Sequence, residues 1–145
     1  ELTAFVAKGH RTCRWLLPQI DPEYCSKSES FNVAKKLIFS ILLSKNGIGM
    51  VSQLQDEFPD NQYEKIITTC PVCKKEIDFT DFNKDGRKDL NSIQMGHNIP
   101  ISRRQGQHNS QNVFWIHRRC NYIKGEQTLK ESMVSLLEII KNHII

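Results

Sequence analysis

Apolar side chains recur at helical spacing in two stretches, one in the first third of the chain and one at its C-terminal end. The first stretch begins at Ser30, which can cap a helix, and runs to about Lys45, where KNGIG indicates a turn. Its apolar positions lie three and four residues apart: Phe31, Ala34, Leu37, Ile38, Ile41 and Leu42. The second stretch, 126–145, carries a similar stripe: Leu129, Met133, Leu136, Leu137, Ile140 and Ile144. We expect two amphipathic helices that pack on other elements or form a dimer surface.

The middle of the chain shows short apolar runs of strand type. Residues 64–79 predict a strand, a tight turn and a second strand, and residues 91–102 predict a further strand. Residues 111–125 predict a short strand that leads directly into a helix. Within these runs, Phe114 and Trp115 stand among apolar neighbours, so we interpret both as core residues rather than platforms for stacked bases.

The change of pattern divides the chain into two parts. Residues 1–64 are predicted to be mainly helical, with a short helix at 51–58, and residues 65–145 combine strands with helices. Apolar residues make up 39% of the 145 residues, which is enough for a core in a chain of one-domain size. The predicted fold class is therefore α+β.

Positive charge is concentrated rather than spread evenly. The net charge is +4, and residues 97–125 contain no Asp or Glu. The basic side chains of this window are Arg103, Arg104, Arg118, Arg119 and Lys124. Such a window predicts a face that binds a polyanion; a solvated basic loop is the alternative.

Features of targeting are missing from the sequence, which has no signal-peptide pattern and no apolar run long enough to cross a membrane. The five cysteines are an odd number, and three of them have metal-like spacing, whereas Cys13 and Cys25 fit core or incidental thiols. We therefore expect a reducing, cytoplasmic setting in a prokaryote or a phage. The first residue is Glu, which indicates a processed chain or a fragment.

Four candidate zinc ligands form two pairs with the same internal spacing. Cys70 and Cys73 enclose one turn, and His117 and Cys120 repeat the step of three residues. Two such turns supply the four ligands of tetrahedral zinc and leave no position open for a substrate. One CxxC pair alone would also suit redox chemistry. The second pair favours a structural zinc site, and the alternative is that His117 is an ordinary packed or surface histidine.

Further polar residues follow in order around these pairs: His97, Pro100 and Ser102 in MGHNIPIS, then Asn112, then Asn121 directly after Cys120. Together with the zinc pairs, this order over roughly residues 68–130 resembles the HNH endonucleases. The resemblance implies a zinc-stapled ββα-metal core that hydrolyses double-stranded DNA and leaves 5′-phosphate and 3′-hydroxyl ends. Within the family, a type II restriction endonuclease is the first interpretation, with a phage or homing-type nuclease close behind.

The resemblance also assigns roles that fit the chemistry of each side chain. His97 would be the general base, because imidazole titrates near neutral pH. Asn112 would hold the loop of His97, and Asn121 would bind a catalytic Mg²⁺, for which Mn²⁺ can substitute. Many members carry Asp directly before the catalytic His, but here that residue is Gly96. Gln94, Asp89 or a backbone carbonyl are alternatives for the missing ligand.

Two other functions stay open at this stage. A zinc-containing DNA-binding module without catalysis would explain Gly96, and a zinc-stabilised protein-interaction domain would not need the basic window. The family often works as a homodimer, which the sequence does not decide.

Base edges could be read from the loop of Gln105, Gln107 and His108. The stretch from Asp81 to Asp89 resembles half of a calcium loop, but Ser92 stands where a Glu ligand is needed, so we interpret it as a polar loop.

Overall fold

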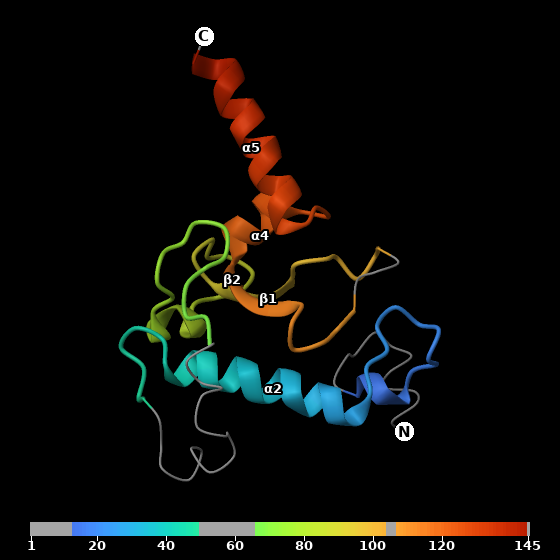
Figure 1. Cartoon of the computed structure of the whole chain (residues 1–145). Coiled ribbons are helices and arrows are strands. Elements are labelled where there is room, and N and C mark those ends of the chain that lie inside the picture. The colour runs from blue at the N-terminus through green and yellow to red at the C-terminus, as the bar shows by residue number, and fades with distance from the viewer. Residues whose placement is uncertain (1–12, 50–65, 104–106, 145) are drawn as a thin grey trace.

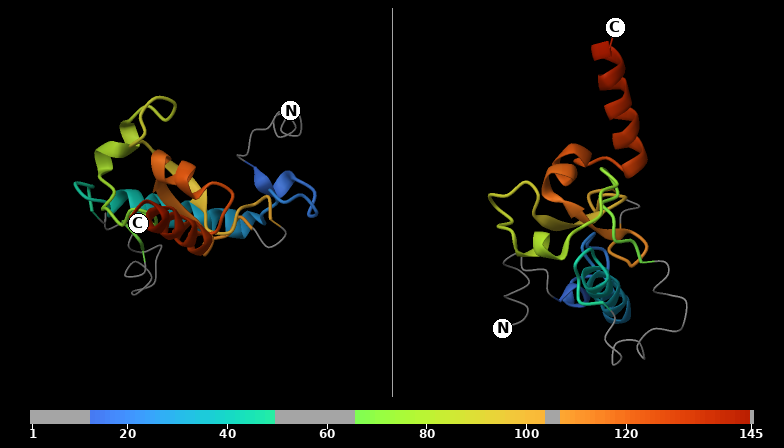
Figure 2. Two further views of the ribbon diagram at one scale, coloured as in Figure 1. Left: turned by 90° about the horizontal axis from the view of Figure 1, so that it is seen from above. Right: turned by 90° about the vertical axis from the view of Figure 1, so that its left-hand side faces the viewer.

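The computed structural model describes residues 13–49, 66–103 and 107–144, which form an α+β arrangement (Figure 1). Their elements follow in the order η1 (Arg14–Leu16), α2 (Lys27–Leu42), η3 (Phe79–Asn83), β1 (Ile93–His97), β2 (Val113–His117), α4 (Arg118–Lys124) and α5 (Leu129–Ile144). Helix α2 lies along one side of the β1–β2 sheet, and α4 and α5 lie on the other side (Figure 1 and Figure 2).

The two strands pair antiparallel, and their register places Gly96 opposite Phe114. The side of the sheet towards α2 forms a small core of Val33, Leu37, Met95, Val113 and Trp115. The indole N–H of Trp115 also donates to the carbonyl of Leu37 at 2.8 Å. Trp115 is therefore half-buried against the core, and it joins the first amphipathic helix to the sheet.

Helix α2 begins one turn before the predicted start at Ser30. Ser26 is its N-cap and accepts a hydrogen bond from the backbone N–H of Glu29 at 3.3 Å. The prediction was wrong because the polar first turn, SKSE, already carries the Ser-x-x-Glu signature of a helix start ahead of the first apolar position. The helix ends at Leu42, also earlier than the predicted limit near Lys45.

The segment 66–79 contains the predicted tight turn but not the two predicted strands. Thr69 and Glu76 form a single antiparallel bridge across the turn, and neither side of the turn extends into a strand in this described segment. Two backbone hydrogen bonds close the turn, from Cys70 N–H to the Lys75 carbonyl at 2.8 Å and from Lys74 N–H to the Cys70 carbonyl at 2.9 Å. The strand expected within 91–102 is confined to β1, and the helix expected at 51–58 lies outside the described residues.

Helix α5 starts with a capping box and extends away from the sheet (Figure 1). The backbone N–H of Thr128 donates to the Glu131 carboxylate at 3.0 Å, and the backbone N–H of Glu131 donates to the Thr128 hydroxyl at 3.2 Å. These bonds give partners to two N–H groups at the start of the helix. The predicted packing of its apolar stripe is not seen among the described residues, because Leu137 and Ile144 are 67% and 76% exposed. A dimer surface on this stripe stays a prediction.

The division predicted at residues 64 and 65 falls outside the described residues and also stays a prediction. Within the described ranges, no helix combines the length and apolar character that crossing a membrane requires.

Candidate functional site

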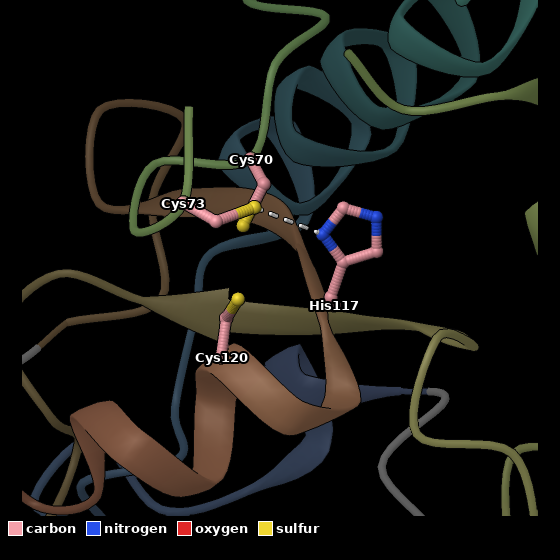
Figure 3. A group of neighbouring side chains, drawn as sticks. All are labelled: Cys70, Cys73, His117 and Cys120. Atoms are coloured by element: carbon pink, nitrogen blue, oxygen red, sulfur yellow. Dashed lines mark hydrogen bonds between the residues drawn. The ribbon is translucent and has the colours of Figure 1, made fainter. Parts of the chain in front are cut away.

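Cys70, Cys73, His117 and Cys120 come together as their spacing predicted, with one potential ligand atom from each lying within 4.8 Å of the others (Figure 3). The first two lie on the tight turn, His117 ends β2, and Cys120 lies in the first turn of α4. Zinc bonds of 2.0–2.3 Å give tetrahedral ligand separations of about 3.3–3.8 Å. Small side-chain rotations would bring the four atoms to these separations, so the cluster could hold a zinc ion.

The cluster forms one of two small cores within the described ranges. Cys70 and Cys120 are 0% and 2% exposed, and they pack with Ile77 and Ile116 between the turn and α4. Partly buried side chains pack around this cluster, among them Phe82, Ile93 and Phe114. A metal at this position would therefore join the turn, β2 and α4 at one point.

The surroundings of the cluster favour the zinc-binding protonation state of His117 but oppose that of Cys120. Burial lowers the pKa of His117, which keeps the imidazole neutral at neutral pH and able to donate a lone pair. Its Nδ1 atom lies 3.5 Å from Cys73 Sγ, while Nε2 lies 3.9 Å from a carboxylate oxygen of Asp81. Burial and the neighbouring Cys70 raise the pKa of the Cys120 thiol to about 12, so a bound cation would have to displace that proton.

His97, the predicted general base, ends β1 and contacts a second histidine. Its Nε2 atom lies 3.0 Å from Nδ1 of His108, a hydrogen-bonding distance. His108 is only 7% exposed, so it does not offer a base-reading side chain at the surface in this conformation. Beside His108 a cavity of about 540 Å³ opens between the segment 19–29 and residues 101–103 and 107–109.

Asn112 lies where β2 begins and binds the loop that follows His97. Its side chain accepts from the backbone N–H of Ile99 at 2.8 Å and donates to the carbonyls of Ile99 and Gln107, at 2.9 and 2.7 Å. The Asn112 carbonyl accepts from Asn98 N–H at 2.9 Å. Asn112 is thus bonded to the loop after His97, and the role in the site that the family resemblance implies for it stays a prediction.

Asn121, the predicted metal ligand, faces β1 from the first turn of α4. Its Nδ2 atom donates to Oε1 of Gln94 at 3.1 Å. Gln94, one of the alternatives for the missing metal ligand, therefore contacts Asn121 directly. Gly96 lies on the same strand face, and a Cβ added there would come within 2.8 Å of the Phe114 ring. Phe114 therefore occupies the space that an acidic side chain at position 96 would need.

The predicted phosphate contacts differ in what they offer a polyanion. Arg119 is exposed, and Arg118 stacks on Tyr122 with its guanidinium 5.3 Å from the ring centre. Arg103 forms two hydrogen bonds with Glu131, at 2.7 and 2.8 Å. Lys124 is 3% exposed and burial lowers its pKa, so the ammonium is not presented to a partner in this conformation. Arg104 lies outside the described residues.

Sequence reasoning did not find the anchoring of the 107–113 segment to α2. Glu29 accepts from the backbone N–H of Ser110 at 2.7 Å, and the ammonium of Lys36 donates to the carbonyls of Ser110 and Val113. These partners lie more than seventy residues apart in the chain, and side chain to backbone bonds leave no pattern in a single sequence. The contact between His97 and His108 was not predicted either, because it depends on how the chain between them folds back, which no spacing in the sequence indicates.

Comparison with solved structures finds a similar fold. A crystal structure described as that of a type II restriction endonuclease superposes with a TM-score of 0.64 at 21% sequence identity. The match covers 88% of this chain and 59% of that chain, so this chain spans less than two thirds of its length. No family model matches the chain, and no curated protein matches it. The likeness shows that this fold occurs in a restriction endonuclease.

Proposed function

We propose that the chain is a metal-dependent endonuclease of the HNH type that hydrolyses DNA, and that it belongs to a type II restriction endonuclease. The observation that supports this most is the placement of His97, Asn112 and Asn121 around the β1–β2 pair, beside the Cys3His cluster. The fold found in a restriction endonuclease supports the same proposal.

The proposed reaction divides the work among four groups. His97 takes the proton of the attacking water, and Asn112 holds the loop that follows His97. Asn121 is the proposed ligand of Mg²⁺, which when bound would stabilise negative charge on the phosphate and on the leaving oxygen. The zinc ion proposed for the Cys3His cluster is structural and would hold α4 against β2 and the turn of Cys70 and Cys73.

Gln94 is the residue that we propose in place of the missing acidic ligand. Its side-chain oxygen already meets the Asn121 amide at 3.1 Å, so both amide groups converge on one side of β1. Amide oxygens are hard ligands that suit Mg²⁺, but they carry no negative charge. We therefore propose a site that binds Mg²⁺ more weakly than a site with a carboxylate would.

Double-stranded DNA is the proposed substrate, and Arg118 and Arg119 on α4 are the proposed phosphate contacts nearest to Asn121. Arg103 would first have to exchange its Glu131 partner for a phosphate. A second candidate function is a DNA-binding module without catalysis. The Phe114 ring over Gly96 favours it, because that ring leaves no place for the acidic ligand.

Cleavage of supercoiled plasmid separates the two functions. The protein is incubated with plasmid in three reactions. The first contains Mg²⁺, the second contains excess EDTA for a short time, and the third receives EDTA and then Mg²⁺ in excess over the chelator. We expect cleavage only in the first and third reactions, and products that DNA ligase rejoins, because the ends carry 5′-phosphate and 3′-hydroxyl. Discrete fragments would identify a restriction enzyme. Salt-sensitive DNA binding with no cleavage in Mg²⁺ or Mn²⁺ would instead establish the binding module.

A further inference from the structure

Two imidazole rings meet at the end of β1, and only one of them has a part in the proposed reaction. The contact joins Nε2 of His97 to Nδ1 of His108 at 3.0 Å, with the rings tilted by 58°. Two neutral imidazoles can share one hydrogen bond in two ways, because either nitrogen can carry the proton. The two arrangements have opposite consequences for His97 as a base.

We propose that His108 is a positioning residue for His97: its Nδ1 atom accepts a hydrogen bond from the Nε2–H of His97, and this sets Nδ1 of His97 as the atom that receives the proton. The proposal deepens the proposed function and depends on it. In the opposite arrangement His108 would donate to Nε2, and the neutral His97 ring would carry its proton on Nδ1, where a base needs a lone pair.

The proposed step then balances. The Nδ1 lone pair of His97 takes a proton from water while the water oxygen bonds to phosphorus. The bond from phosphorus to O3′ breaks, and its electron pair stays on O3′, which solvent protonates. His97 becomes an imidazolium, and its Nε2–H bond to His108 becomes a stronger, charge-assisted one. His108 thus stabilises the product of proton transfer without exchanging a proton itself.

The fold holds His108 firmly enough for this task. Asn109 Oδ1 accepts from the backbone N–H groups of Gln111 and Asn112, at 3.1 and 2.9 Å, and closes the turn that follows His108. Ser110, which follows Asn109, is bound to α2 at both of its backbone groups. Its N–H donates to Glu29, and its carbonyl accepts from Lys36. Helix α2 therefore supports the loop from outside the sheet, which gives the first third of the chain a part in the site.

Burial, more than the charges around the pair, favours a neutral His108, and Glu29 opposes it. The charged groups that face it are Arg14 from η1, which is itself paired with Glu23, and Glu29 from α2, with Lys36 of the same helix bonded to the adjoining backbone. Burial, with smaller contributions from Arg14 and His97, lowers the pKa of His108 to about 4. His108 is thus uncharged at neutral pH and can accept the bond from a protonated His97.

The variants His108→Leu and His108→Asn test the arrangement, because Asn places an oxygen acceptor near the position of Nδ1 and Leu places none. NMR titration of the His97 ring gives the first readout. We expect the pKa of His97 to fall in His108→Leu, since the imidazolium loses its acceptor, and to stay near the wild-type value in His108→Asn. A rise or no change in His108→Leu would overturn the proposal, because loss of a donor to Nε2 raises that pKa.

Plasmid cleavage gives the second readout, with zinc content and circular dichroism as checks of folding. We expect kcat to fall about 10- to 100-fold in His108→Leu, within the range of general-base effects, with KM for DNA little changed. The acid limb of the pH profile should move to lower pH, and His108→Asn should restore much of the rate. Equal rates for the wild type and His108→Leu would overturn the positioning role. If the wild type cleaves no DNA while the pKa of His97 shifts as expected, the proposed function fails and the hydrogen-bond assignment stands.

Discussion

The ring of Phe114 lies directly across the strand pair from Gly96, so close that a Cβ on residue 96 would meet Phe114 Cε2 at 2.8 Å and Ile116 Cγ2 at 3.0 Å. An aromatic side chain that covers a glycine on the neighbouring strand supplies packing that the glycine lacks. The packing of Phe114 on Gly96 therefore leaves no room for the acidic metal ligand that many members of the family carry at this position.

Gly96→Ala should destabilise the protein by about 1–3 kcal/mol, because the added methyl group overpacks the sheet face. In the Phe114→Leu background the same substitution should cost less, because the aromatic edge atom that it meets is absent. Urea unfolding of the four proteins measures both effects as a double-mutant cycle. Equal costs in the two backgrounds would mean that Phe114 does not limit residue 96.

Zinc should be bound at one ion per chain, and its loss should unfold the part of the protein around α4. Cys73→Ser removes a ligand and should abolish zinc binding, while Cys13→Ser, which changes a thiol outside the cluster, should retain one ion. Structural zinc contributes about 10–16 kcal/mol of apparent binding free energy, comparable to the whole stability of a small domain. Elemental analysis and circular dichroism of both variants decide this, and a folded wild type without zinc would contradict it.

Stability should depend on pH through His108. Its pKa is about 4 in the folded protein and 6.5 in an unfolded chain, so the unfolded state takes up the proton first as the pH falls. The stabilisation is complete above pH 6.5 and is lost between pH 6.5 and 4, by on the order of 3 kcal/mol. Urea unfolding at pH 7 and pH 5 measures the loss. His108→Asn keeps the zinc ligands and should lose less stability over the same interval, whereas an equal loss would assign it to the zinc cluster.

DNA affinity should separate the exposed from the paired arginines. Arg119→Ala should weaken binding to all sequences and reduce the salt slope of log K by about 1, as expected for one phosphate contact. Arg103→Ala should weaken it less, because Glu131 already neutralises that guanidinium at 2.7 Å. Fluorescence anisotropy over a range of salt concentrations measures both slopes. A larger effect from Arg103 would show that DNA displaces Glu131.

The sequence predicted the parts of this site that depend on local spacing. The four zinc ligands follow from two turns, and the step from β2 into α4 follows from the apolar run that ends at His117. The loop-holding position of Asn112 came from the family resemblance. Long-range relationships were different, because no local pattern shows that Glu29 reaches Ser110 or that His97 meets His108. The predicted start of α2 was wrong because the cap at Ser26 precedes the first position of the apolar stripe, Phe31, by more than a turn.

The proposed function depends most on His97 as the base, and a matched pair of histidine variants tests this directly. His97→Ala removes the ring at the end of β1, and His143→Ala removes an exposed ring near the end of α5, far along the chain from the site. Both variants are compared with the wild type for plasmid cleavage in Mg²⁺, with zinc content measured in each. The account predicts that His97→Ala keeps its zinc and its DNA binding but loses cleavage by at least about 100-fold, while His143→Ala cleaves like the wild type. Undiminished cleavage by His97→Ala would contradict the account.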